Sequence, residues 1–128
     1  MRYLLDTHFL IWIPVADRRI PASVVSLLAD PDNEFLFSTA SLWEIAIKHG
    51  AGKASFPYEA RGIRTRLMNA GYEELPVLGE HALTVETLQP IHNDPFDRLL
   101  IAQARVEGVI LLTTDRIVAK YGSSVRRV

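Results

Sequence analysis

The sequence predicts an α/β fold, a three-layer sandwich in which helices cover both faces of a central, mostly parallel sheet. Apolar runs of strand length alternate along the chain with segments in which apolar residues recur at helical spacing, and this alternation is typical of such a sheet. The chain has 128 residues, of which 48% are hydrophobic, so it is long enough to bury a core as a single domain over 1–128. It has no cysteine, which excludes disulfides and thiolate metal sites.

The clearest pair of elements lies in the last third of the chain. Pro95 suits the first position of a helix, Gly108 suits a left-handed C-cap, and a buried strand follows over 109–115. The helix from Asp97 to Gly108 would run roughly 16 Å, and the strand would return about 20 Å. We therefore expect Asp97 and Asp115 at the same edge of the sheet.

The other elements follow from apolar runs and the breakers between them. Pro14 interrupts a helix, Gly50 and Gly71 end helices, and Pro76 confines its strand to a sheet edge, because a central strand needs the N–H that proline lacks. The expected elements, in chain order, are strand 2–5, helix 9–13, helix 22–29, strand 34–38, helix 41–49, helix 57–70, edge strand 74–78, helix 79–88, the pair described above and a weak last strand over 124–128.

Charge and hydropathy limit the classes of function. The net charge is −1, so the chain has no global positive field, and any nucleic-acid binding must be local. Apolar runs such as 9–13 are too short to span a bilayer. The N-terminus has no signal-peptide cleavage pattern. We therefore expect a protein of the microbial cytoplasm that is not bound to a membrane.

Acidic residues fall where this architecture places functional sites, at the carboxyl ends of strands and in the first turns of the helices that follow. They are Asp6, Glu44, Asp97 and Asp115. Each has a structural alternative, because an Asp after a strand commonly forms a turn, and acids in a first turn suit the helix dipole. Glu44 also fits a capping box with Ser41 and an i,i+4 pair with Lys48. Asp115 also suits a cap for 116–121.

Together the acids point to a metal. Carboxylates that converge on one rim repel one another, which raises their pKa values and costs stability unless positive charge lies between them. Oxygen ligands suit Mg²⁺ or Mn²⁺, and such a cation can activate a water for attack on a phosphodiester. The histidines show no spacing typical of a ligand pair. We interpret His8 as packing beside the site, and His49, His81 and His92 as surface residues.

Four motifs carry a resemblance to a known family. They are LLDTH at 4–8, SLWEIAIK at 41–48, DPFDRLLIAQA at 94–104 and the shorter LTTD at 112–115. In order and spacing they resemble the PIN-domain family, and most closely its VapC-type toxins of bacterial type II toxin–antitoxin pairs. The resemblance spans nearly the whole chain. It implies a metal-dependent endoribonuclease that is inhibited by a small cognate antitoxin and that commonly forms a homodimer.

The resemblance also assigns residues. Asp6, Glu44 and Asp97 match the three main acids of the family, and Asp115 matches its more variable fourth. They would hold one or two Mg²⁺ or Mn²⁺ ions and a metal-activated water that hydrolyses RNA. Small polar positions near the acids are matched by Thr7, Ser41 and Thr114, and we interpret Asp94 first as a helix cap and then as a site residue. The basic residues expected to contact RNA are Lys48, Arg98 and Arg116, although a solvated face is the usual role of such residues.

Other functions remain as alternatives. A PIN-fold binding module without catalysis is less favoured, because all four acids are retained. A nuclease acting on DNA would share the chemistry, but such relatives are usually larger. A phospho-acceptor signalling domain needs paired acids after the first strand, whereas Thr7 and His8 follow Asp6. We favour the endoribonuclease.

Overall fold

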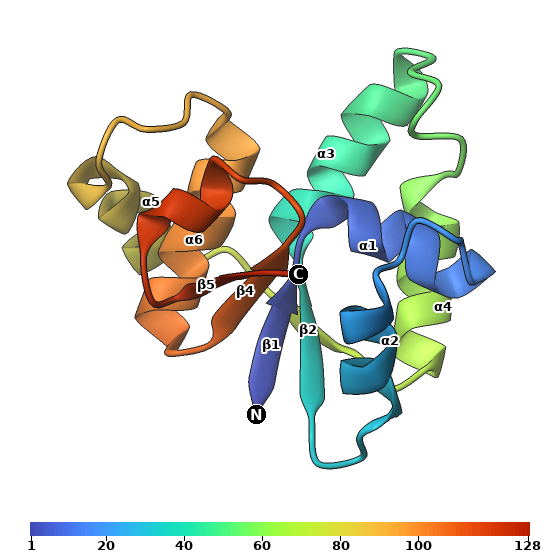
Figure 1. The fold of residues 1–128 in the computed structure, drawn as a ribbon. Coiled ribbons are helices and arrows are strands. Elements are labelled where there is room, and N and C mark those ends of the chain that lie inside the picture. The colour runs from blue at the N-terminus through green and yellow to red at the C-terminus, as the bar shows by residue number, and fades with distance from the viewer.

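A five-stranded sheet, parallel throughout, forms the centre of the protein (Figure 1). The computed structural model describes all residues from 1 to 128. The strands are β1 (Arg2–Leu5), β2 (Glu34–Ser38), β3 (Glu73–Leu75), β4 (Ile110–Thr113) and β5 (Val125–Arg127), in the spatial order β3-β2-β1-β4-β5. The predicted α/β class is confirmed, and β3 is an edge strand as expected, although it ends at Leu75, so that Pro76 follows the strand instead of lying within it.

Helices cover both faces of this sheet. The α-helices are α1 (Thr7–Trp12), α2 (Ala22–Ala29), α3 (Thr39–Gly50), α4 (Ala60–Asn69), α5 (Gly79–Thr84) and α6 (Pro95–Glu107), and the 3₁₀ turns are η1 (Ile13–Val15), η2 (Val85–Thr87) and η3 (Val118–Tyr121). Figure 1 shows α1, α2 and α4 on one side of the strands and α5 and α6 on the other, with α3 rising from the carboxyl end of β2. None of the helices combines the length and apolar character that a bilayer span requires.

Two separate apolar clusters hold these layers together. Tyr3 and Leu5 of β1 pack with α1, α2 and α4, whereas Leu4 between them packs with α6 and η3. This division follows from the strand period of two, which sends successive side chains to opposite faces. The strands are apolar on both faces because both are covered, as is usual for parallel sheets.

Some helix starts differ from the expectation. Helix α3 begins at Thr39 with Ser38 as its N-cap, whose hydroxyl accepts from the Ala40 N–H at 3.0 Å. The capping box between Ser41 and Glu44 is therefore wrong. Helix α4 begins at Ala60 rather than at residue 57, and the expected helix over 79–88 ends as η2. Pro14 lies inside η1 and so interrupts the α-helix as expected.

Gly108 and Gly62 offer a matched pair of stability tests. Gly108 ends α6 at a φ of +66°, where a Cβ costs roughly 1–2 kcal/mol. Gly62 lies inside α4, and an added Cβ there would meet no atom within 4 Å. We expect Gly108→Ala to destabilise the fold by about 1 kcal/mol and Gly62→Ala to stabilise it by about 0.5–1 kcal/mol. Urea unfolding measures both, and a shift of the same sign in both variants would contradict the assigned backbone conformations.

Candidate active site

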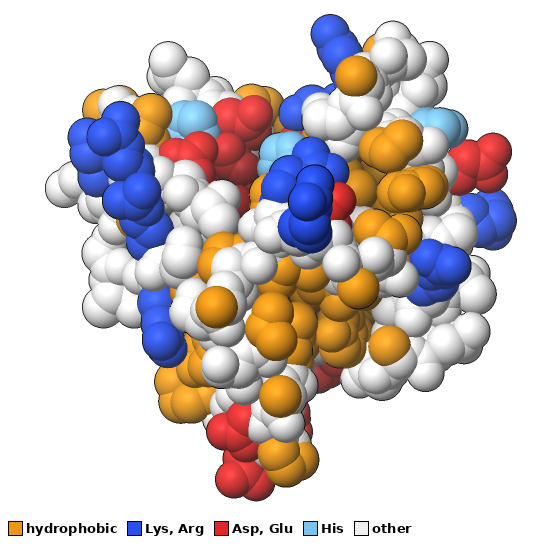
Figure 2. Space-filling model, turned by 45° about the vertical axis from the view of Figure 1, so that its right-hand side comes forward, with side chains coloured by type: hydrophobic (Ala, Val, Ile, Leu, Met, Phe, Trp, Pro, Cys, Tyr) orange, Lys and Arg blue, Asp and Glu red, His pale blue; other side chains and the backbone are white.

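The predicted acids line one cavity at the carboxyl edge of the sheet. The cavity has a volume of about 370 Å³ and is lined by Asp6, Thr7, His8, Trp12, Glu44, Lys48, Asp94, Asp97, Thr114 and Asp115. Figure 2 shows acidic and histidine side chains gathered in a hollow, with lysines and arginines on both sides of it. A larger hollow of about 570 Å³ between Gly108 and Ser124 has no acidic lining, so we take the acidic cavity as the candidate site.

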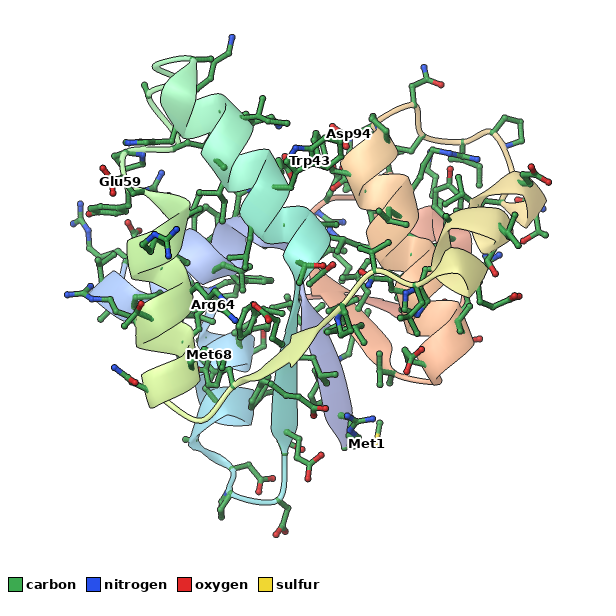
Figure 3. All side chains as sticks on the ribbon, turned by 180° about the vertical axis from the view of Figure 1, so that it is seen from behind. Met1, Trp43, Glu59, Arg64, Met68 and Asp94 are labelled. Carbon is green, nitrogen blue, oxygen red and sulfur yellow. The ribbon has the colours of Figure 1, made fainter.

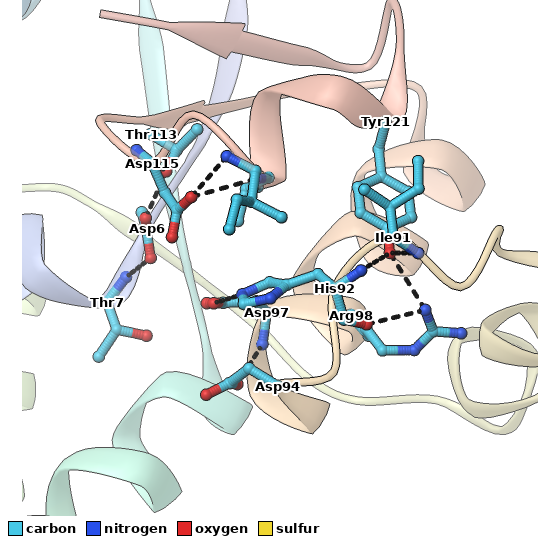
Figure 4. A network of polar contacts seen from close by, with 12 residues as sticks. Asp6, Thr7, Ile91, His92, Asp94, Asp97, Arg98, Thr113, Asp115 and Tyr121 are labelled. Carbon is cyan, nitrogen blue, oxygen red and sulfur yellow. Dashed lines mark hydrogen bonds and ion pairs between the residues drawn. The ribbon is translucent and has the colours of Figure 1, made fainter.

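Asp6 is positioned by the pairing of β1 with β4. Its N–H continues the ladder to the Leu112 carbonyl at 3.1 Å, and it is the N-cap of α1, with Oδ1 accepting from the Thr7 N–H at 2.7 Å. Its Oδ2 accepts from the Thr113 hydroxyl at 2.6 Å, and that hydroxyl in turn accepts from the Asp115 N–H at 3.0 Å. Thr113 therefore joins the two acid-bearing strand ends (Figure 4).

Glu44 lies on the inner side of α3 and is 4% exposed. Its Oε1 accepts from the Thr7 hydroxyl at 2.9 Å, and its Oε2 pairs with the Lys48 ammonium. The Thr7 and Ser41 hydroxyls also lie 2.9 Å apart. Because the single Thr7 proton goes to the carboxylate, the Ser41 hydroxyl donates to Thr7. The predicted i,i+4 pair of Glu44 and Lys48 is confirmed.

Asp94 and Asp97 lie at the start of α6. Asp94 caps the helix, since its Oδ1 accepts from the Asp97 N–H at 3.0 Å. The Asp97 carboxylate accepts through Oδ2 from the His92 ring, whose Nε2 is 2.7 Å away (Figure 4). Asp94 also lines the cavity, so it has the geometry both of a cap and of a site residue.

Asp115 also has two roles. Its Oδ1 accepts from the Ile117 N–H at 2.7 Å and from the Val118 N–H at 3.3 Å, which stabilises the turn into η3. Its other oxygen has no hydrogen-bond partner, and the same holds for Oδ1 of Asp97. Donor atoms of His92, Asp97 and Asp115 lie within 4.8 Å of one another. Asp97 and Asp115 line the cavity and are therefore best placed to hold a cation, whereas the His92 ring lies beside them in contact with Asp97.

Burial and mutual repulsion disturb the ionisation of these acids. The pKa of Asp97 rises to about 7, first because the side chain is desolvated and then because Asp6 is close, while the hydrogen bond from His92 opposes the rise. Burial also raises the pKa of Asp6, against the hydrogen bonds from Thr113 and Thr7. Partial burial opposes the charge of Lys48, but the hydrogen bond to Glu44 and the attraction of Glu44, Asp94 and Asp97 together outweigh it and raise the pKa of Lys48.

The histidines depart most from the expectation. His8 packs on the rings of Trp12 and Phe56 beside the cavity, as interpreted. The other three are not surface residues. His81 is fully buried against Glu107, His49 is half-buried with Nδ1 2.9 Å from the Phe56 carbonyl, and His92 contacts Asp97. The irregular segment before Asp94 gives no periodic signal that could have placed His92 in the site.

Two further corrections concern Arg98 and Thr113. The Arg98 side chain is directed at backbone carbonyls and the Tyr121 hydroxyl rather than at the cavity, so we withdraw it from the expected RNA contacts. Thr114 lines the cavity, as expected for a small polar residue near the acids. The neighbouring Thr113, which sequence reasoning missed, holds the Asp6 carboxylate because the alternation of β4 turns its side chain inward.

The fold and the site together define an α/β domain with a carboxylate-rich centre at the carboxyl edge of its sheet. The chain belongs to the PIN-domain family, whose family model, described as PIN domain, matches residues 3–123. PIN domains that resemble VapC toxins are typically nucleases. A comparison with curated proteins finds no match.

Several solved structures with a similar fold come from toxin–antitoxin complexes. A chain of VapBC2 from Rickettsia felis, bound to a DNA fragment from the promoter, is similar with a TM-score of 0.68 and 16% identity over 99% of this chain and 98% of that one. A chain of VapBC-1 from nontypeable Haemophilus influenzae has a TM-score of 0.64 and 20% identity, over 99% of this chain and 98% of that one. A chain of a toxin–antitoxin complex from Klebsiella pneumoniae has a TM-score of 0.65 and 22% identity, over 97% of this chain and 95% of that one.

The raised pKa of Asp97 predicts a pH dependence of stability in the metal-free protein. The folded pKa of about 7 lies above the ordinary value of 3.8, so the folded state holds the proton more tightly than the unfolded chain. Stability from this group is therefore complete below about pH 4 and is lost as the pH rises towards 7. We therefore expect the difference in unfolding temperature between the wild type and Asp97→Asn, measured in EDTA, to change against the wild type as the pH rises from about 4 to 7. A constant difference would contradict the raised pKa.

Proposed function

We propose that this chain is a divalent-metal-dependent endoribonuclease and the toxin of a type II toxin–antitoxin pair. The observation that carries the proposal is that four acids from separate motifs line one cavity, and two of them present oxygens without a protein partner. Membership of the PIN-domain family supports nuclease chemistry. Similarity to chains of VapBC complexes supports the toxin assignment, although at 16–22% identity it establishes the fold alone.

The residues present fit a hard divalent cation. The cavity is lined by five carboxylates and a single lysine, Lys48, which is already paired with Glu44. Burial, followed by repulsion from neighbouring carboxylates, raises the pKa values of Asp6 and Asp97, and a bound cation would offset both effects. Carboxylate oxygens in a water-accessible cavity suit Mg²⁺ or Mn²⁺. Such a cation, when bound, lowers the pKa of water and stabilises charge on the reacting phosphate.

The hydrogen bonds assign roles among the acids. Asp97 and Asp115 would hold the cation through their unpartnered oxygens. Asp6 and Glu44, whose oxygens already accept from Thr7, Thr113 or Lys48, would contribute through remaining lone pairs or through water. The Thr7 and Thr113 hydroxyls orient these carboxylates without adding positive charge, and of the two only Glu44 is paired with a cation, Lys48. Asp94 would add its second oxygen at the rim.

RNA would be held beside the acids by local positive charge. Arg116 is exposed and follows Asp115 directly, and Lys48 lines the cavity. Lysines and arginines flank the acidic hollow on both sides (Figure 2), an arrangement suited to a phosphate backbone that crosses the site. Single-stranded loops are the favoured substrates, because their phosphates and bases are accessible.

An antitoxin would bind in a groove between the α1–η1 segment and α4. A hollow of about 260 Å³ is lined there mainly by Ile11, Pro14, Val15, Tyr58, Ile63 and Arg66. Val15 and Tyr58 are 39% and 44% exposed. An apolar groove between helices is the kind of surface that accepts an amphipathic helix.

A second apolar surface suits a homodimer. Trp43 and Ile47 lie one turn apart on α3 and are 62% and 46% exposed. Trp43 packs edge-on against Phe96, with ring centroids 5.4 Å apart, and Figure 3 shows Trp43 directed towards the start of α6 near Asp94. A second copy that covered this surface would bring two acidic cavities close together.

Cleavage of RNA is the direct test of the proposed activity. The purified chain, free of antitoxin, is expected to cut a mixed pool of structured RNA with Mn²⁺ or Mg²⁺ and to leave 5′-phosphate and 3′-hydroxyl ends. EDTA should abolish cutting, and Asp97→Asn should reduce it by about 100-fold or more, because a ligand to the cation is lost. Gel analysis and end-mapping measure the products.

The matched control for this test is Asp32→Asn, which makes the same change in an exposed turn and should leave cleavage intact. If Asp97→Asn cuts as well as the wild type, the assigned site is wrong. If the folded, metal-loaded protein cuts no RNA, the binding-module alternative is favoured. Equal cutting of a DNA copy of the substrate would favour the DNA nuclease.

The antitoxin groove makes a separate prediction. Val15→Glu puts a charge on an exposed side chain of the groove, so it should leave folding and RNA cleavage intact. It should abolish co-purification with a co-expressed antitoxin that binds the wild type, because the charge would be buried in the complex. Unchanged co-purification would show that the partner binds elsewhere.

A further inference from the structure

We propose that Arg98 and Tyr121 act as positioning residues that hold the segment 88–93 so that His92 fixes the carboxylate of Asp97. We call Arg98 and Tyr121 the clasp. The importance of Asp97 for metal binding rests on the proposed function, but the contacts of the clasp stand independently of it. The sequence pattern did not predict these roles for His92, Arg98 or Tyr121.

Tyr121 supplies the centre of the clasp. The residue is 4% exposed and belongs to η3, yet its hydroxyl reaches the segment before α6. The hydroxyl accepts from the N–H groups of Ile91 and His92, at 3.2 and 2.8 Å (Figure 4). It donates to the Gln89 carbonyl at 2.9 Å. One phenol oxygen thus satisfies three backbone groups in a segment that has little regular structure of its own.

Arg98 closes the clasp from the first turns of α6. Its Nη1 lies 3.0 Å from the Gln89 carbonyl, 3.3 Å from the His92 carbonyl and 3.1 Å from the Tyr121 hydroxyl, and its Nη2 donates to the Val85 carbonyl at 3.2 Å. Arg98 forms no ion pair with a carboxylate. A guanidinium has five donors in a rigid plane, and here they serve to shape a loop.

Tyr121 is itself fixed to the same helix. Arg105 lies two turns after Arg98 on α6 and donates through Nη2 to the Tyr121 carbonyl at 2.8 Å. The ring of Tyr121 also packs in the apolar cluster that includes Leu100 and Leu88. The tyrosine therefore cannot swing away from α6 without losing both a hydrogen bond and buried contacts.

The effect of the clasp is concentrated on His92. Its N–H is held by Tyr121 and its carbonyl by Arg98, so the backbone is fixed on both sides of the side chain. The ring then places Nε2 2.7 Å from Oδ2 of Asp97. This contact selects one orientation of the carboxylate and leaves Oδ1 turned to the cavity. A partner that orients a ligand in this way commonly contributes 10–100-fold to metal affinity.

The clasp is tested by amide exchange at Ile91 and His92 in the metal-free protein. Tyr121→Phe removes only the hydroxyl, and we expect exchange at both amides to become at least about tenfold faster, because their acceptor is lost. Tyr3→Phe is the matched control, since the Tyr3 ring is also buried but its hydroxyl has no partner, and it should leave both rates unchanged. Unchanged rates in Tyr121→Phe would overturn the clasp.

The link to Asp97 is tested by Mn²⁺ affinity, measured by calorimetry with the metal alone. We expect His92→Leu to weaken Mn²⁺ binding by about 10–100-fold. His92→Gln should bind Mn²⁺ more tightly than His92→Leu, because glutamine keeps a hydrogen-bond donor. Tyr121→Phe should weaken binding less than His92→Leu does. The double variant Tyr121→Phe/His92→Leu should be no weaker than His92→Leu, because both act through one contact. Independent, additive losses, or wild-type affinity in His92→Leu, would overturn the proposal.

Two controls distinguish a failure of the clasp proposal from a general loss of stability and from a failure of the proposed function. Gly108→Ala lowers stability far from the cavity and should leave Mn²⁺ affinity unchanged. If the wild type itself binds no Mn²⁺, the proposed function fails, and the exchange rates at Ile91 and His92 then decide by themselves whether the clasp exists.

Discussion

The parallel pairing of β1 with β4 is the constraint on which the rest of the molecule depends. Leu5 pairs with Leu112, so both strands end at the same level and deliver Asp6 and Thr113 to one edge. The hydrogen bond between these two side chains, across 107 positions in the sequence, exists only because the strands run in the same direction and in this register. A slip by one residue would turn Leu4 and Leu5 to the wrong cores and move Asp6 out of the site.

The buried acids that give the site its negative charge also lower the stability of the folded state. Burial and mutual repulsion oppose ionisation of Asp6 and Asp97. The groups that hydrogen-bond to the buried carboxylates are mainly hydroxyls and amides, and only a few are cations. Thr7 and Thr113 hold the carboxylates by hydrogen bonds that leave their charge in place. A lysine at each acid would give a more stable protein and a poorer cation site. Such exchanges of stability for function are common at active sites.

The sequence predicts the convergence of the acids better than it predicts their surroundings. Strand polarity and helix length bring Asp97 and Asp115 to one edge, and both line the cavity. Arg98 and His92 could not be placed in the same way, because the path of the segment that joins them is set by Tyr121, which is distant in sequence. The role of Thr113 was missed because it depends on where β4 ends, and the pattern does not fix this boundary to one residue.

The long separation of the contacts around the site also affects when the site can form during synthesis. A nascent chain that has just passed Asp97 carries three of the four acids but lacks β4, Thr113 and the Tyr121 hydroxyl, so neither Asp6 nor His92 is held in place. The ribosome can therefore complete nearly the whole polypeptide before an organised acidic cavity exists beside it.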